Sequence, residues 1–134
     1  MHDDVKDNLS ARPQARTRLA RRAVVEAARD LFLEGGYATT TVAAISRRAD
    51  VPEPTIYRLF SSKLGILKVL LDVSIAGDDE PIAMNDRPEM IHVRTRDNAP
   101  ETLRAYAAFA RMLVARTGPL LGVVLAEGAG SDAE

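Results

Sequence analysis

The chain has 134 residues, of which 28% are charged and 46% hydrophobic, a composition that fits one globular domain or two small lobes. It contains no cysteine, which excludes disulfide frameworks, thiolate zinc sites and cysteine nucleophiles. The two histidines, His2 and His92, lie far apart in the sequence and offer little for a metal site or a serine–histidine triad. The sequence therefore favours a protein that is not an enzyme, and it predicts no metal and no cofactor.

The location of the protein is predicted from two absent signals. Uninterrupted apolar runs stay well short of the roughly 18 residues of a membrane span. The N-terminus carries Asp3, Asp4 and Asp7 instead of the basic flank and apolar core of a signal peptide. We therefore expect a cytoplasmic protein without a membrane partner.

The net charge of -1 hides an asymmetry between the two halves of the chain. Residues 1–68 contain 12 basic and 8 acidic side chains, a net charge of +4, whereas residues 69–134 contain 6 and 11, a net charge of -5. Of the 18 basic residues 15 are arginine, the side chain best suited to bidentate contacts with phosphates and base edges. The basic half is predicted to meet a polyanion, although charge alone would also fit a helical protein with solvated faces.

The first third of the chain indicates a polar arm followed by a helix. Residues 1–16 are polar, are interrupted by Pro13 and lack sustained periodicity, so they are predicted to be a mobile arm. From Thr17 to Glu34 apolar residues recur at helical spacing, and Gly35-Gly36 ends the pattern.

Two short helices and a turn follow. The threonines before Val42 offer N-cap hydroxyls for a helix over 42–49. Asp50 occupies a turn position, where aspartate tolerates the left-handed conformation better than most residues do. Pro52 and Pro54 indicate the start of a helix from Glu53 to Phe60, because proline is tolerated in the first helical turn.

A fourth helix, from about Lys63 to Ile75, is capped by Ser61-Ser62. The three helices before it, with a short break between the second and third, describe a helix-turn-helix unit. The short helices need the first and fourth helices to close a core. The predicted core comprises Ala28, Phe32, Val42, Ile45, Val51, Ile56, Phe60 and Leu64. The exposed side of helix 53–60 then offers Glu53, Thr55, Tyr57 and Arg58, a set that suits a helix lying in a major groove.

These residues resemble a known family. The segment TTVAAISRRADVPEPTIYRLFSSK, preceded by VVEAARDLFLEGGY, is similar to the DNA-binding domain of tetracycline-repressor (TetR) family transcriptional regulators. The resemblance extends from near Arg18 to Lys63. It departs from the usual pattern at the turn, where Asp50 stands at a position that is commonly glycine and Pro52, Glu53 and Pro54 replace smaller residues.

The resemblance implies a set of DNA contacts. Thr55 and Tyr57 would face bases and backbone, and Lys63 would meet a phosphate at a helix N-terminus. The full implied set is Arg18, Thr40, Thr41, Arg47, Arg48, Thr55, Tyr57, Arg58 and Lys63. Within it Thr40 or Thr41, with Arg47 or Arg48, would hold phosphates, although Arg47 and Arg48 could form a solvated face and Tyr57 could be half-buried support.

Residues 64–134 are predicted to form a partial helical regulatory domain. A loop with a short helix near 87–96 follows Ile75, and its acids Asp78-Asp79-Glu80 are expected to be solvated rather than to bind a metal. Asn98 and Glu101 resemble a capping box that opens a helix. Another helix is expected to start at Thr117 with Pro119, and its apolar character requires burial.

The resemblance also implies a small-molecule effector and an assembly. The candidate effector lining is Met84, Met90, Tyr106, Phe109, Met112 and Leu113, although ordinary helix packing is the more common role for any one of these residues. Residues 131–134 have the spacing of a capping box, and family members continue with further helices, so the chain is expected to be a C-terminally truncated member. A homodimer is expected for a full-length form and is doubtful for this chain.

Together these observations predict an all-α protein. It comprises a mobile arm over 1–16, a three-helix helix-turn-helix DNA-binding domain over 17–63 and a partial regulatory domain over 64–134. The predicted function is a transcriptional regulator, a repressor that a small-molecule effector releases from a near-palindromic DNA operator. The alternatives are a protein-interaction module that uses the helix-turn-helix surface and a truncated regulator that lacks operator binding.

Overall fold

A computed structural model describes the backbone of residues 3–131 and the side chains of residues 14–127. All regular elements of this part are helical: α1 (Asp3–Gly35), α2 (Val42–Ala49), α3 (Glu53–Phe60), α4 (Lys63–Ala76), the short 3-10 helix η1 (Met84–Asp86), α5 (Pro88–Arg94) and α6 (Ala99–Ser131). The all-α prediction is confirmed, and α2, α3 and α4 begin where the sequence indicated.

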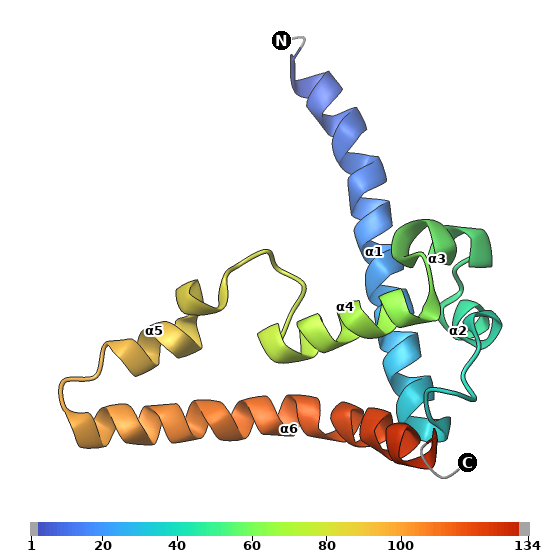
Figure 1. The fold of residues 1–134 in the computed structure, drawn as a ribbon. Coiled ribbons are helices and arrows are strands. Elements are labelled where there is room, and N and C mark those ends of the chain that lie inside the picture. The colour runs from blue at the N-terminus through green and yellow to red at the C-terminus, as the bar shows by residue number, and fades with distance from the viewer. Residues whose placement is uncertain (1–2, 132–134) are drawn as a thin grey trace.

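The helices form two parts (Figure 1). We call α1 to α4 the head, and η1, α5 and α6 the return arm. α1 is a rod, and α2 and α3 pack beside it, while α4 crosses it and leads away from them. A linker and α5 follow, and α6 then runs back along α4 toward the carboxyl end of α1. Residues far apart in the sequence therefore meet where α6 returns to the head.

α1 begins at Asp3, well before the Thr17 start that the sequence indicated. The stretch that was expected to be an irregular arm thus lies within the helix. It contains no glycine, and its last turns include Ala11, Arg12, Gln14, Ala15 and Arg16, residue types with good helix propensity. Pro13 removes only one backbone N–H from the hydrogen-bond ladder of a long helix.

The core of the head is built as predicted, with one exception. Ala28, Phe32, Val42, Ile45, Val51, Ile56 and Phe60 are all buried, together with Val24, Ile66, Leu67 and Leu70. Leu64, also predicted to be core, is 50% exposed. α4 turns Ile66, Leu67 and Leu70 toward the core, and Leu64 falls off that face.

The joints between the short helices are fixed by specific caps. The hydroxyl of Thr41 accepts the N–H of Ala44 at 3.1 Å and so caps α2. Asp50 adopts the expected left-handed conformation (φ 54°), and its N–H donates to the carbonyl of Ser46. Ser62 caps α4 by accepting the N–H of Gly65 at 3.0 Å.

Gly65 controls the angle between α3 and α4, because a Cβ at this position would overlap the backbone carbonyl of Phe60. We predict that Gly65→Ala lowers the free energy of unfolding by about 2 kcal/mol, since backbone atoms cannot move aside as a side chain can. Gly122→Ala is the matched control, because a Cβ there meets nothing within 4 Å. It should raise the free energy of unfolding by about 0.5 kcal/mol. Urea unfolding measures both, and a harmless Gly65→Ala would contradict the packing.

The acids of the linker after α4 are exposed, as expected, and two of them also pair with arginines. Arg22 of α1 forms a two-pronged pair with Asp79, with nitrogen–oxygen distances of 2.7 and 2.8 Å. Arg87, which is buried, bonds both carboxylate oxygens of Asp78 at 2.9 and 3.0 Å and also donates to the carbonyls of Glu80 and Ile82. The linker is therefore attached to the head through Arg22.

This attachment predicts a dependence on pH. The hydrogen bond from Arg22 lowers the pKa of Asp79 below its ordinary value, so the pair stabilises the fold above an unfolded-state pKa of about 3.9. That contribution is lost as the pH falls through the lower folded-state pKa. A carboxyl NMR titration should place the midpoint of Asp79 below that of the free side chain. Arg22→Gln should return the midpoint toward the free value, and an unchanged midpoint would contradict the pairing.

The return arm confirms the short helix near 87–96 and the cap of the helix after it. The side-chain oxygen of Asn98 accepts the N–H of Glu101 at 3.0 Å, as the capping-box spacing predicted. The expected separate helix from Thr117 is wrong, because α6 continues through Pro119. Pro119 has no backbone N–H, so it removes one hydrogen bond from the helix. The helix is held on either side of this gap: the Thr117 hydroxyl donates to the carbonyl of Leu113 at 2.8 Å, and the Leu120 side chain is buried.

Two further expectations concern α6. Ser131 is its last residue, and the rest of the predicted capping box, residues 132–134, lies outside the described residues. Residues 99–127 are long and apolar enough to cross a membrane by length and composition, although the sequence has no uninterrupted apolar run of that length. Only 11% of that stretch is buried, and Arg111 and Arg116 interrupt it, so length and composition alone do not indicate a membrane span.

Candidate nucleic-acid interface

α3 presents two different faces. Ile56 and Phe60 lie one helical turn apart and are buried in the head. Tyr57 is 50% exposed, Arg58 is exposed and Thr55 is half-buried. Tyr57 is therefore not a core residue, and α3 offers a hydroxyl, an aromatic ring and a guanidinium to whatever lies against it.

α2 places further polar groups beside α3. Thr41 is exposed at its N-cap, and Arg47 is exposed on its last turn. Within residues 14–127 no ion pair involves Arg47, whereas Arg48 is bonded to Glu34 at 3.0 Å and lies 3.9 Å from Asp30. Of the two arginines, Arg47 is the freer to meet a phosphate.

Thr40 has an internal role. It is buried, and its hydroxyl donates to the carbonyl of Gly36 at 2.7 Å and lies 3.3 Å from the carbonyl of Leu31. A hydroxyl held in this way ties the α1–α2 loop to the end of α1. Of the two threonines considered for a phosphate contact, the geometry therefore favours Thr41.

Lys63, the first residue of α4, stabilises the same loop. Its ammonium donates to the carbonyls of Tyr37 at 2.8 Å and Thr40 at 3.1 Å, and it lies 4.2 Å from the centre of the Tyr37 ring. An ammonium has three N–H donors, so two are used inside the protein and one is left for another acceptor. Lys63 thus joins the α1–α2 loop to the start of α4.

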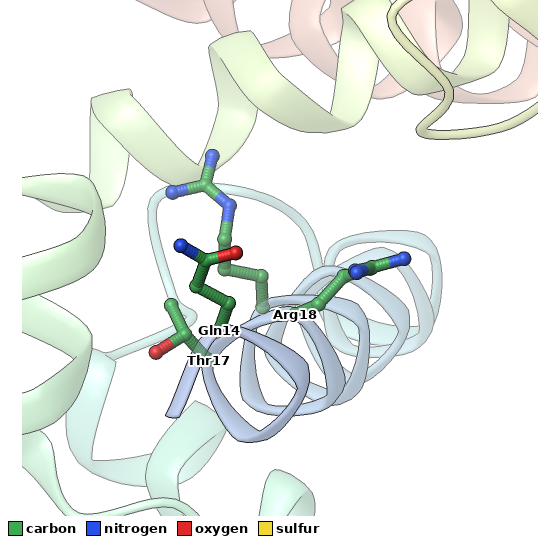
Figure 2. A pocket seen from close by; sticks show the side chains of 4 residues that line it. Gln14, Thr17 and Arg18 are labelled. Atoms are coloured by element: carbon green, nitrogen blue, oxygen red, sulfur yellow. The ribbon is translucent and has the colours of Figure 1, made fainter. Parts of the chain in front are cut away.

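α1 contributes two further basic groups, Arg18 and Arg21. Gln14, Thr17, Arg18 and Arg21 line a shallow hollow of about 320 Å³ on α1. In Figure 2 the Arg18 side chain extends away from those of Gln14 and Thr17. Arg18 is exposed. The sequence analysis missed Arg21, whose guanidinium lies 5.0 Å from the ring centre of Phe60 and 3.3 Å from the carbonyl of Leu59.

Arg21 thus ties α1 to α3, and Glu127 forms the other contact that the sequence analysis missed. Its carboxylate accepts the N–H of Ala38 at 2.7 Å, which connects the far end of α6 to the α1–α2 loop. Neither contact follows from spacing, because the partners are 38 and 89 residues apart. The run of basic residues at 16–22 was the only signal for Arg21.

The candidate effector lining lies on the return arm. Met84, Met90, Phe109, Met112 and Leu113 are half-buried, and Tyr106 is 58% exposed. None of the six lines the hollow on α1 or the larger groove of about 930 Å³ between α1, α4 and the linker. That groove has Val25, Val69 and Val73 among its walls.

An exposed helix carried on a shared core, after a capped short helix and a left-handed turn, defines a helix-turn-helix domain. Comparison with known proteins agrees: residues 24–70 match the family described as bacterial regulatory proteins, tetR family. The chain is also 40% identical over 48 residues to an uncharacterized HTH-type transcriptional regulator, YvkB, of Bacillus subtilis (strain 168). That match covers 36% of this chain and 25% of the relative.

The comparison with solved structures gave no match. Residues 24–70 therefore match a helix-turn-helix domain of the tetR family of bacterial regulatory proteins. The aligned part spans about a quarter of the length of its Bacillus relative, so the family assignment describes the head.

The exposure of Tyr57 generates a prediction for the interface. Tyr57→Ala should weaken binding to a selected duplex site by about 1–3 kcal/mol and leave the helical content unchanged, because the ring is outside the core. Phe60→Ala is the contrasting variant, since its ring is buried and its loss should lower helicity and binding together. Fluorescence anisotropy and circular dichroism measure the two quantities. A loss of helicity in Tyr57→Ala would show that the ring supports the fold.

Proposed function

We propose that the protein is a transcriptional regulator that binds duplex DNA by laying α3 in the major groove. The observation that carries this proposal is the two-sided character of α3: Ile56 and Phe60 fix it to the core, and Tyr57 and Arg58 are left exposed. A recognition helix needs this combination of a rigid support and a free polar face. The tetR family match to residues 24–70 supports the same reading.

The proposed contacts divide between bases and phosphates. Thr55 and Tyr57 face base edges and the adjoining backbone. Arg58 and the free Arg47 meet phosphates, and Thr41 and the remaining N–H of Lys63 assist them at two helix N-termini. Arg18 on α1 extends the contact along the backbone. Arg48 is already paired with Glu34, so it adds to the positive potential near the DNA and makes no direct bond to a phosphate.

The proposal includes a repressor acting on a near-palindromic operator. A single head with an eight-residue recognition helix reads few base pairs, so specific binding requires two heads on successive half-sites. A homodimer supplies both heads, and occupancy of the operator then blocks transcription. Such a protein acts in the cytoplasm without membrane contact and performs no enzymatic step.

Release by a small-molecule effector is the last part of the proposal. α6 contacts the head through Glu127 at the Ala38 N–H, and the linker contacts it through Asp79 at Arg22. An effector bound between α5 and α6, against residues such as Met90, Phe109 and Met112, would displace α6 along its length. The displacement would reach the α1–α2 loop and lower the population of heads held for DNA.

The salt dependence of binding tests the DNA interface directly. Each phosphate contact removed lowers the slope of log K against log salt by about one. We predict this loss for Arg47→Ala on both specific and random duplexes. Arg104 of α6 is also exposed, and Arg104→Ala should leave the slope unchanged. Equal slopes for the two variants, or no duplex binding at low salt, would contradict the proposal.

Lys63→Ala adds a second readout to the same experiment. It should lower the salt slope and also reduce the free energy of unfolding, because two carbonyls of the α1–α2 loop lose their donor. Reduced stability with an unchanged slope would remove Lys63 from the phosphate contacts and leave its structural role.

A further inference from the structure

The groove between α1, α4 and the linker is a hollow of ligand size. Its volume of about 930 Å³ falls within the roughly 300–1,000 Å³ that is typical of small-molecule sites. Its floor is apolar, because Val25 of α1 and the half-buried Val69 and Val73 of α4 line it. The six candidate effector residues lie on the return arm, outside this groove. The groove is therefore separate from the proposed effector site.

The walls of the groove are rows of side chains on the two helices. On α1 the row is Arg18, Arg22 and Glu26, which lie four positions apart and so share one face of the helix. On α4 Asp72 stands beside the apolar floor. The linker acids, residues 78–80, contribute further carboxylates. Charged groups thus surround an apolar floor.

The positive charges of the groove already have partners. Arg22 is paired with Asp79 at 2.7 and 2.8 Å. Arg21 is directed toward α3, where its guanidinium lies 5.0 Å from the ring centre of Phe60. The hydrogen bond from Arg22 lowers the pKa of Asp79, and the charge of Arg18 adds to that effect, so Arg18 acts on the same carboxylate. Little positive charge is left for an anionic ligand.

Negative charge is in excess in the groove. Five carboxylates line it against three guanidiniums, and two of the five are paired with arginines. The other three, Glu26, Asp72 and Glu80, are exposed and form no ion pair with any side chain that the structure describes. Exposed carboxylates beside an apolar floor are complementary to a ligand that joins a positive charge to an apolar body.

We infer that this groove binds a small organic cation, an amine or quaternary ammonium carried on an apolar body. The apolar body lies on Val25, Val69 and Val73. The positive group lies near Glu26 and Asp72, which come from different helices. A metal ion would not use the apolar floor, and within the described residues no group of three or more acids or histidines is arranged to hold one.

A ligand in this groove touches α1 and α4 at once. The angle between these two helices holds the core of the head together, so the ligand would restrain α4 against α1. The inference concerns binding by the protein alone and does not depend on the proposed function.

An NMR titration of the whole chain tests the inference with three ligands that share one apolar body: phenylbutylamine, phenylbutanol and phenylbutyrate. We expect saturable shifts of the Val25, Val69 and Val73 methyl groups. The amine should bind about fivefold more tightly than the alcohol, because two exposed carboxylates attract it, and the carboxylate ligand should bind most weakly. Added salt should shrink the preference for the amine, since the carboxylates are exposed to solvent.

Substitutions separate the charge from the apolar floor. Asp72→Asn should weaken binding of the amine about threefold and leave binding of the alcohol unchanged. Asp30→Asn is the matched control, since Asp30 is an exposed acid of α1 one turn beyond Glu26 and does not line the groove. It should leave both affinities unchanged. Val73→Thr should weaken the amine and the alcohol alike, because it makes the floor more polar.

Four results would overturn the inference: no saturable shift at millimolar ligand, equal affinities for the amine and the alcohol, tighter binding of phenylbutyrate, or equal effects of Asp72→Asn and Asp30→Asn. Shifts confined to the methionines of the return arm would also overturn it, because they would place the ligand outside the groove. These titrations contain no DNA, and the Arg47→Ala salt slope is measured without ligand. Failure of the inference is therefore distinguishable from failure of the proposed function.

Discussion

The orientation of α3 depends on a core that α3 cannot form by itself. Two helices of eight residues bury too little apolar surface to be stable alone. Ile45 of α2 and Ile56 of α3 are buried only because Phe32 of α1 and Ile66 of α4 close the same core. The long helices α1 and α4 therefore fix the orientation of α3 and of its exposed Tyr57. Because α3 packs against α4, a movement of α4 would also move α3.

The α1–α2 loop is where the head and the return arm meet. Lys63, at the start of α4, holds two of its carbonyls, and Glu127, near the end of α6, holds the N–H of Ala38. The Tyr37 ring lies 4.2 Å from the Lys63 ammonium and 5.2 Å from the Phe32 ring, and burial together with the charge of Glu127 raises the pKa of Tyr37. A change anywhere along α6 therefore has a short physical route to the core of the head.

Much of the head could be predicted from local signals, because helix caps and turns depend on residues that are close together in the sequence. The Thr41 cap, the left-handed Asp50 and the bounds of α3 follow from such signals, and so does the exposure of Tyr57. The remainder depends on pairs distant in the sequence, such as Arg22–Asp79 and Glu127–Ala38. The break expected at Pro119 failed for the same reason, since burial of Leu120 against the head outweighs a local helix-breaking signal.

The most direct test of the account is an amide NMR titration of the labelled chain with a selected duplex. We expect chemical shifts to change first at Thr41, Arg47 and Lys63 and along Glu53–Arg58. Perturbation confined to α6, with α3 unaffected at saturating DNA, would contradict it. That result would mean that the exposed face of α3 is not the surface that meets nucleic acid.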